Sequence, residues 1–281
     1  MRVEDNGPQV QERVLGKSMA AQLSTRQVEV AELAAQGYSN REIASELKMT
    51  EQIVKNVLHT VFDKIGVWNR VELANRLLKD ESPAVLAESQ RRIEAERLAE
   101  VQRRQILDSK AEQVFDEITR IAVATFDVPI ALVALIDSGR VWFKSNIGLE
   151  VSEVPRELTI CHHTIQQSEI LALANAPLDS RFICNPLVQE FGVRFYAAAP
   201  ILTEDGYALG VVCIVDRVAR EFSASQLSVL TALARIALQQ IELRCELLEQ
   251  QAINPAQTCS GAEMQLVPRN GAGLNAKQSD A

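Results

Sequence analysis

Reactive side chains gather at one place in the sequence, the run Cys161-His162-His163. A thiol beside imidazoles can form a nucleophilic thiolate, and cysteine and histidine also ligate metals or haem. Three readings are open: a structural cysteine, a contact to a small ligand, or a metal or redox site. Consecutive residues point in different directions, and the spacing to Cys184 or Cys213 matches no known zinc pattern. The sequence therefore gives no support to an enzyme here, and it also lacks a Gly-rich phosphate loop.

A second polar group lies within residues 50–65, TEQIVKNVLHTVFDKI. Apolar residues recur there at three- and four-residue steps and predict one buried helix face: Ile53, Val54, Val57, Leu58, Val61 and Ile65. The other face carries Lys55, Asn56, His59 and Lys64. Lysine and asparagine are common readers of base edges in the DNA major groove. We therefore expect a DNA recognition helix, capped by Thr50 and ended by Gly66.

Composition restricts the classes of protein to which these residues can belong. A length of 281 residues, 47% of them hydrophobic, allows about two packed domains. The formal net charge of −8 argues against coating nucleic acid through bulk charge, but it allows a local docking face. The first residues lack a secretory signal, no apolar run is long enough to span a bilayer, and no CxxC pair occurs. We therefore expect a cytoplasmic location and no membrane partner.

Two shorter helices are predicted ahead of the recognition helix, and each has a capping-box start signal. The capping pairs are Ser24 with Gln27, and Ser39 with Glu42. A three-residue turn leads from the second helix to Thr50, and one more helix is predicted over residues 69–78. Two short helices joined by a tight turn, the second one partly basic, form the helix-turn-helix pattern.

These features occur together in wording that closely resembles the LuxR/GerE-type DNA-binding domain over residues 23–79. The shared marks are the Leu-Ser-x-Arg-Gln start, Ser39-Asn40-Arg41-Glu42-Ile43-Ala44, Val54-Lys55, and Lys64-Ile65-Gly66-Val67 followed by Arg70. The resemblance implies an all-α four-helix unit over residues 23–80, whose third helix enters the major groove of double-stranded DNA. The DNA-binding residues expected from the motif are Lys55, Asn56 and His59 at base edges, Thr50, and Arg41, Lys64 and Arg70 nearer the backbone.

Two features of this region predict weak binding by one copy. Residues 23–80 carry eight basic and eight acidic side chains, so one copy neutralises few phosphates. Ile53 and Val57 stand where the family usually has threonine and often histidine, and isoleucine cannot donate a hydrogen bond to a phosphate. Two copies would double the DNA contacts, and we therefore expect a homodimer.

Residues 84–105, AVLAESQRRIEAERLAEVQRRQ, contain no glycine or proline and predict a helical linker. Their apolar residues are too sparse for a sustained heptad repeat, which favours a solvated connecting helix or a short two-chain one. A mere exposed spacer and a signalling helix both remain open. Residues 1–22 are polar and predict a flexible lead-in, and residues 251–281 are polar and aperiodic and predict a disordered tail.

Residues 106–248 carry helical patterns at both ends and β-rich runs between them. This order predicts an α+β domain with a central antiparallel sheet. The predicted strands are residues 130–136, 140–147, 170–174, 195–202 and 208–216. The wording resembles the GAF sensory domain in phrases such as Ile106-Leu107-Asp108, Trp142-Phe143-Lys144-Ser145, Asn185-Pro186, Arg194-Phe195-Tyr196 and Gly206-Tyr207-Ala208-Leu209-Gly210.

The GAF resemblance implies a small-molecule pocket beside the sheet, and often dimerisation through the first and last helices. The candidate ligand contacts are Cys161, His162, Phe182, Arg194, Tyr196 and Cys213, with ligand and cofactor unknown. Arg194 has two readings, a structural ion pair or a grip on an anionic ligand. Trp142 and Phe143 are strand neighbours, so one is expected in the core and one at the surface.

Together these features predict a DNA-binding transcription regulator, not an enzyme, whose GAF domain senses a small molecule or mediates dimerisation. One alternative is a ligand-free GAF dimerisation module with constitutive DNA binding. The other is a thiol or redox enzyme, since free-methionine-sulfoxide reductases are GAF proteins that work with cysteines. The cysteine spacing does not support the second alternative, and an attached DNA-binding domain argues against it.

Overall fold

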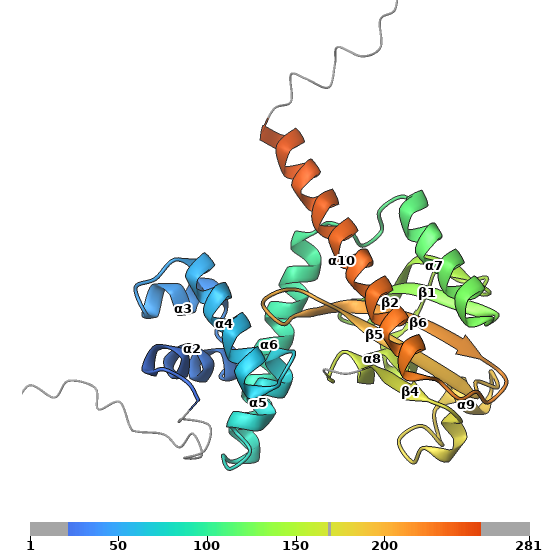
Figure 1. The fold of residues 1–281 in the computed structure, drawn as a ribbon, viewed down its shortest axis with the longest axis horizontal. Coiled ribbons are helices and arrows are strands. Elements are labelled where there is room, and N and C mark those ends of the chain that lie inside the picture. The colour runs from blue at the N-terminus through green and yellow to red at the C-terminus, as the bar shows by residue number, and fades with distance from the viewer. Residues whose placement is uncertain (1–21, 168–169, 254–281) are drawn as a thin grey trace, which may run out of the picture.

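A computed structural model describes residues 22–167 and 170–253 of the chain. Its N-terminal part is a helical bundle, and its C-terminal part is a six-stranded antiparallel sheet between two helical layers (Figure 1). One long helix joins the two parts. The predicted lead-in falls on residues 1–21, and the predicted tail mostly on residues 254–281, which lie outside the described residues.

The N-terminal bundle has the four predicted helices. They are α2 (Thr25–Ala35), α3 (Asn40–Glu46), α4 (Glu51–Ile65) and α5 (Arg70–Leu77). Both predicted capping boxes form, at Ser24 and at Ser39. Helix α4 begins at its N-cap Thr50 and ends at Gly66, whose φ of 71° is the left-handed conformation that glycine adopts without a Cβ clash. The all-α prediction for this part is confirmed.

The buried face of α4 differs from the prediction at one residue. Val54, Leu58, Val61 and Ile65 are buried together with Phe62, but Ile53 is 47% exposed. Successive helix residues are turned by about 100°, so Ile53 lies at the edge of the stripe that Val54 begins. The prediction that Ile53 is an inward residue is therefore wrong.

The C-terminal sheet has the strand order β3-β2-β1-β6-β5-β4, and all its neighbours are antiparallel. The strands are β1 (Ile130–Ile136), β2 (Arg140–Ile147), β3 (Glu153–Pro155), β4 (Leu171–Leu173), β5 (Phe195–Leu202) and β6 (Ala208–Asp216). The two hairpins, β1–β2 and β5–β6, have the predicted bounds. The prediction of an α+β domain with a central antiparallel sheet is confirmed.

Both faces of this sheet are covered, which gives the domain two cores. Helices α7 (Gln113–Phe126) and α10 (Ala224–Ile253) pack on one face. The other face is covered by short elements: η1 (Arg156–Leu158), α8 (Cys161–Thr164), η2 (Ala176–Leu178) and α9 (Pro186–Gln189). Trp142 therefore lies in the first core and Phe143 in the second, and the prediction that one of them is at the surface is wrong.

The connecting helix α6 (Pro83–Arg103) packs on both domains. Its buried stripe has four-residue spacing and consists of Ser89, Ile93, Arg97 and Val101. Ile93 belongs to the core of the N-terminal bundle and Val101 to the first core of the sheet domain. The prediction that this helix is solvated is thus wrong. Half of the buried stripe is polar, so the periodicity of apolar residues does not reveal that this face is buried.

Arg97 and Glu94 anchor α6 to the sheet domain. The buried guanidinium of Arg97 donates to the backbone oxygens of Ile136, at 2.8 Å, and Ala208, at 3.2 Å. Glu94 accepts from Arg97 at 2.8 Å and from Arg156 at 2.6 Å. Burial by itself would raise the pKa of Glu94, but these two hydrogen bonds outweigh it and lower the pKa to about 2.

Replacement of Glu94 by glutamine is expected to destabilise the protein in a pH-dependent way. The variant leaves the buried Arg97 without its charged acceptor, which should cost about 1–2 kcal/mol of unfolding free energy at neutral pH. The folded pKa lies below the ordinary value of 4.5, so this stability is present above pH 4.5 and is lost as the pH falls toward 2. Urea unfolding at several pH values measures the difference.

Glu88→Gln is the matched control, because Glu88 lies on the same helix and pairs with Arg91 in the exposed region. Exposed pairs contribute little, so this variant should unfold like the wild type at every pH. If both variants lose the same amount, or if the Glu94→Gln loss is undiminished below pH 2, the anchoring role of Glu94 is wrong.

Candidate nucleic-acid interface

Two of the expected base readers on α4 are open to solvent. The Asn56 side chain is exposed and its oxygen accepts a hydrogen bond from the Gln52 amide at 3.1 Å. The ring of His59 is also exposed, with Nδ1 3.3 Å from the Asp63 carboxylate one turn later. Both partners are on the same surface of the helix, so neither base reader is held by the core.

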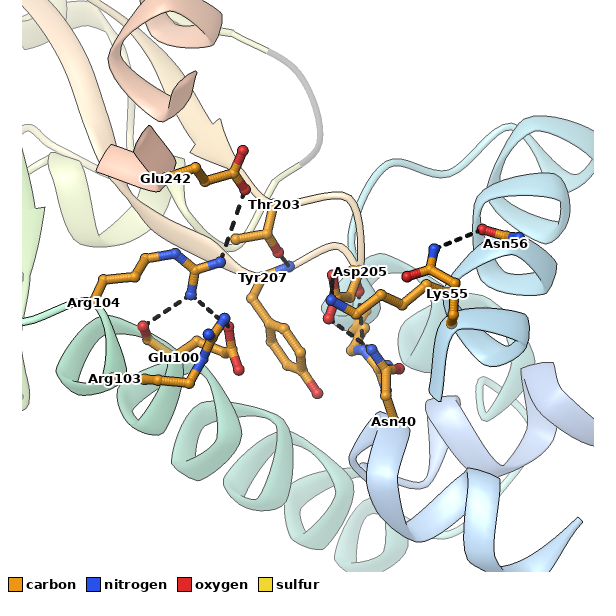
Figure 2. Close-up of polar contacts among 12 residues, drawn as sticks. Asn40, Lys55, Asn56, Glu100, Arg103, Arg104, Thr203, Asp205, Tyr207 and Glu242 are labelled. Carbon is orange, nitrogen blue, oxygen red and sulfur yellow. Dashed lines mark hydrogen bonds and ion pairs between the residues drawn. The ribbon is translucent and has the colours of Figure 1, made fainter. Parts of the chain in front are cut away.

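Lys55, the third expected base reader, faces the sheet domain. Its ammonium group lies 3.9 Å from the carboxylate of Asp205, and the Lys55 side chain is only 33% exposed. Asp205 also accepts a hydrogen bond of 2.6 Å from the Asn40 amide of α3 (Figure 2). Asp205 belongs to the turn between β5 and β6, residues 203–207, which we call the hairpin tip. The hairpin tip thus contacts the recognition helix directly.

Arg70 is fully buried beneath the hairpin tip, so the structure contradicts its expected place beside the DNA backbone in this conformation. Its guanidinium donates to the backbone oxygens of Tyr38, at 2.7 Å, and Asp205, at 3.0 Å. It also stacks on the ring of Tyr207, 4.7 Å from the centroid. The backbone N–H of Arg70 donates to the Gly206 oxygen at 3.2 Å. A buried guanidinium needs such partners, and the sheet domain supplies half of them.

The remaining expected DNA contacts lie on α3 and at the two ends of α4. Arg41 is exposed on α3. The hydroxyl of Thr50 accepts the Ile53 N–H at 3.3 Å and thereby caps α4. Lys64 is exposed, and its ammonium group donates to the Gln22 backbone oxygen at 3.1 Å and to the side chain of Gln27 at 3.0 Å.

A groove of about 740 Å³ separates the recognition helix from the sheet domain. One wall comes from α4 and the turn after it, and the facing wall comes from β5, the hairpin tip and α10. The lining residues are His59, Phe62, Asp63, Val67, Trp68, Ile170, Ala199, Pro200, Leu202, Thr203, Glu204, Leu227, Thr231, Ala234, Arg235 and Leu238. The side of α4 that carries His59 therefore faces α10 across the groove.

Four of the six candidate ligand contacts share the second core of the sheet domain. These four are Cys161, Phe182, Tyr196 and Cys213, and all are buried. His162 lies at the edge of this core and accepts a hydrogen bond from Arg156 at 3.1 Å. Arg194 is exposed and donates to the Val188 backbone oxygen at 3.5 Å, so it lies outside this core, and its contact with a ligand stays a prediction.

The Cys161-His162-His163 run does not converge on a single point. Cys161 faces the second core, His162 faces Arg156, and His163 packs edge-on against the ring of Phe182 at 5.0 Å. Within residues 22–167 and 170–253, no three His, Cys, Asp or Glu side chains form a group that could hold a metal ion.

Cys213 in the second core and His162 at its edge are both held neutral. The hydrogen bond with Cys161 and burial raise the pKa of Cys213 well above its usual range. Burial and the Arg156 charge lower the pKa of His162, so its ring is uncharged at neutral pH. The hydrogen bond with Cys213 lowers the pKa of the buried Cys161 thiol, against the effect of burial. A neutral thiol is a poor nucleophile, so Cys213 is a packing residue here.

Sequence reasoning missed the residues that join the two domains, Asn40, Asp205 and Tyr207. The Glu204-Asp205-Gly206 run was recognisable only as a turn, and Tyr207 only as part of the GAF-like phrase that begins at Gly206. In the structure Tyr207 belongs to the core of the N-terminal bundle. No local pattern links residues so far apart in the chain, and an acidic residue at a turn is ordinary.

Comparisons with known proteins give two family matches. Residues 21–77 match the family described as bacterial regulatory proteins, luxR family, and residues 110–241 match the GAF domain. In the part of the chain that the structure describes, no helix is long and apolar enough to cross a membrane.

Relatives and solved structures match one part of the chain or the other. The chain is 37% identical over 150 residues to the cyclic di-GMP phosphodiesterase PA2567 of Pseudomonas aeruginosa, over 53% of this chain and 26% of that protein. It is 39% identical over 59 residues to the transcriptional regulatory protein DesR of Bacillus subtilis, over 21% of this chain and 30% of that protein. The crystal structure of the GAF domain from an Acinetobacter phosphoenolpyruvate-protein phosphotransferase is 17% identical and has a TM-score of 0.40, with 56% of this chain and 98% of that chain covered. The chain thus spans under a third of either relative. By its two family matches, it joins a DNA-binding domain of the luxR family of bacterial regulatory proteins to a GAF domain.

Proposed function

We propose that this protein is a sequence-specific, double-stranded-DNA-binding transcription regulator that works as a homodimer and is not an enzyme. The observation that carries the proposal is the open polar face of α4, with Asn56 and His59 exposed, in a domain of the luxR family. The similarity to a phosphodiesterase covers the GAF region and 26% of that protein, so it carries no activity to this chain.

The exposed surface of α10 supports a dimer of GAF domains. Val229, Ile236 and Leu243 recur at seven-residue spacing and are 38%, 41% and 50% exposed. Leu247, four residues after Leu243, extends this stripe and is about half exposed. Ile121, also half exposed, lies on α7, which packs against α10. A contiguous apolar stripe on a surface helix marks an interaction site, and a second copy presents the same stripe.

Burial of the candidate ligand contacts favours the GAF domain as a dimerisation module over a sensor. Cys161, Tyr196 and Cys213 are inside the second core, so a ligand reaches them only if the covering segments move. Native mass spectrometry of the full chain separates the two roles. A bound small molecule supports a sensor, and a mass equal to that of the polypeptide supports the module.

Asn56→Ala is expected to weaken specific DNA binding by about 1–3 kcal/mol, the usual contribution of one good base contact. Asn56 is a better test than Lys55, because Lys55 also contacts Asp205 and its removal has two effects. The measurement is the Kd for a duplex enriched from a random-sequence pool by the wild-type protein.

Gln113→Ala is the control for this substitution. Gln113 is an exposed amide on α7 that bonds a neighbour one turn away, as Asn56 does on α4. The control should bind DNA like the wild type. Wild-type affinity in Asn56→Ala would remove this residue from the recognition surface.

Ile236→Glu is expected to convert the dimer to a monomer, because a dimer would bury one charge from each copy at the centre of the α10 stripe. Sedimentation velocity at micromolar concentration measures the change. Val218→Glu is the control, since Val218 is 64% exposed in the loop after β6 and away from the stripe. A monomeric wild type, or an Ile236→Glu variant that remains dimeric, contradicts the assignment of this interface.

A further inference from the structure

We propose that the hairpin tip is an intramolecular plug, which competes with DNA for the recognition helix. This inference rests on the DNA-binding function proposed above and adds its regulation. In the closed conformation seen here, the GAF domain holds the DNA-binding domain in a form that cannot dock on a duplex. DNA binding then requires the hairpin tip to leave the bundle.

The hairpin tip offers the bundle the same kind of acceptor that DNA would offer, an anionic oxygen. The Asp205 carboxylate takes a hydrogen bond from Asn40 at 2.6 Å and lies 3.9 Å from the Lys55 ammonium. DNA would offer the same donors its phosphate or base oxygens. The Asp205 carboxylate and a DNA phosphate are both anions and repel each other, so Asp205 and DNA compete for Lys55.

Docking of the hairpin tip also removes a second cation from the surface. Arg70 is fully buried, and its guanidinium is enclosed by the backbone of Asp205 and the ring of Tyr207. A buried cation releases no counterions from DNA, and the bundle has no surplus of positive charge to replace it. Closing therefore lowers both specific and non-specific affinity.

Space gives an independent argument. A recognition helix is about 10–12 Å across and fills a major groove about 12 Å wide, so DNA must surround it on both sides. Across a groove of about 740 Å³, the His59 side of α4 faces α10 instead. The duplex cannot enter this space while the hairpin tip holds the two domains together.

Gly206→Ala tests the plug directly. A Cβ at this position would lie 2.7 Å and 2.8 Å from two ring carbons of Phe62 and 3.2 Å from the Asn69 Cα, so it would push the hairpin tip off the bundle. Gly192→Ala is the matched control, because Gly192 has a similar φ of 71° but no neighbour within 4 Å. Both variants carry the same backbone strain, and only one carries the clash.

The expected result concerns full-length protein and short duplexes of random sequence. Gly206→Ala should bind at least about tenfold more tightly than the wild type, since opening removes the population cost of the closed state. Gly192→Ala should bind like the wild type. Asp205→Asn keeps the shape and removes one charge, so it should bind up to about fivefold more tightly.

Hydrogen exchange at the Arg70 amide reports opening independently of DNA. This N–H bonds to the Gly206 oxygen at 3.2 Å, and it should exchange faster in Gly206→Ala and Asp205→Asn than in Gly192→Ala. Faster exchange with tighter DNA binding supports the plug.

Three outcomes overturn the plug. Faster exchange at unchanged DNA affinity would show that closing does not compete with DNA, and the proposed function would survive. If the Arg70 amide exchanged no faster in Gly206→Ala and Asp205→Asn than in Gly192→Ala, the contacts of Gly206 and Asp205 would not be what holds the hairpin tip. An opened variant that binds no duplex would overturn the proposed function, and the plug with it.

Discussion

A single buried guanidinium organises the contact between the two domains. Charge taken out of water must be matched by hydrogen bonds, and Arg70 finds them in two places at once. Tyr38 and Asn40 supply oxygens from the DNA-binding domain, and the hairpin tip supplies the Asp205 oxygen and the Tyr207 ring. Half of the groups around Arg70 come from the sheet domain. Arg70 can therefore be buried in this way only while the two domains are in contact. When the hairpin tip leaves, water can hydrate the Arg70 guanidinium. Opening an apolar interface of the same size would instead expose apolar surface to water.

The connecting helix also holds the strand that follows the hairpin tip. Arg97 of α6 donates to the oxygen of Ala208, the residue that begins β6 directly after Tyr207. Arg97 shares Glu94 with Arg156, and Arg156 reaches His162 at the edge of the second core. The connecting helix thus touches the hairpin, the sheet and the short elements over the second core. These polar contacts run without a break from the edge of the second core to the residue beside the hairpin tip.

Local sequence patterns were enough to predict the elements whose ends are fixed by nearby residues. Capping pairs, a terminating glycine and period-two runs gave α4 and both hairpins at or near their observed bounds. Two of the errors come from neighbours that no local window contains. Trp142 and Phe143 are both buried because the sheet is covered twice, and α6 is buried through Ser89 and Arg97. At the candidate site, the type of each polar residue on α4 was readable, but the partner of Lys55 lies 150 positions away.

A plug built into each copy has a consequence for a dimer on paired half-sites. Each recognition helix can enter a major groove only after the hairpin tip of its own copy has moved away. Binding of one dimer therefore requires the opening free energy of both copies. The occupancy of DNA then depends on the square of the open fraction, and a small change in the closed state becomes a larger change in binding. Linkage makes the effect reciprocal: DNA stabilises the open form by as much as closing weakens DNA binding. Any ligand that reaches the GAF domain controls DNA only through a difference in its affinity for these two forms, because equal affinity shifts nothing.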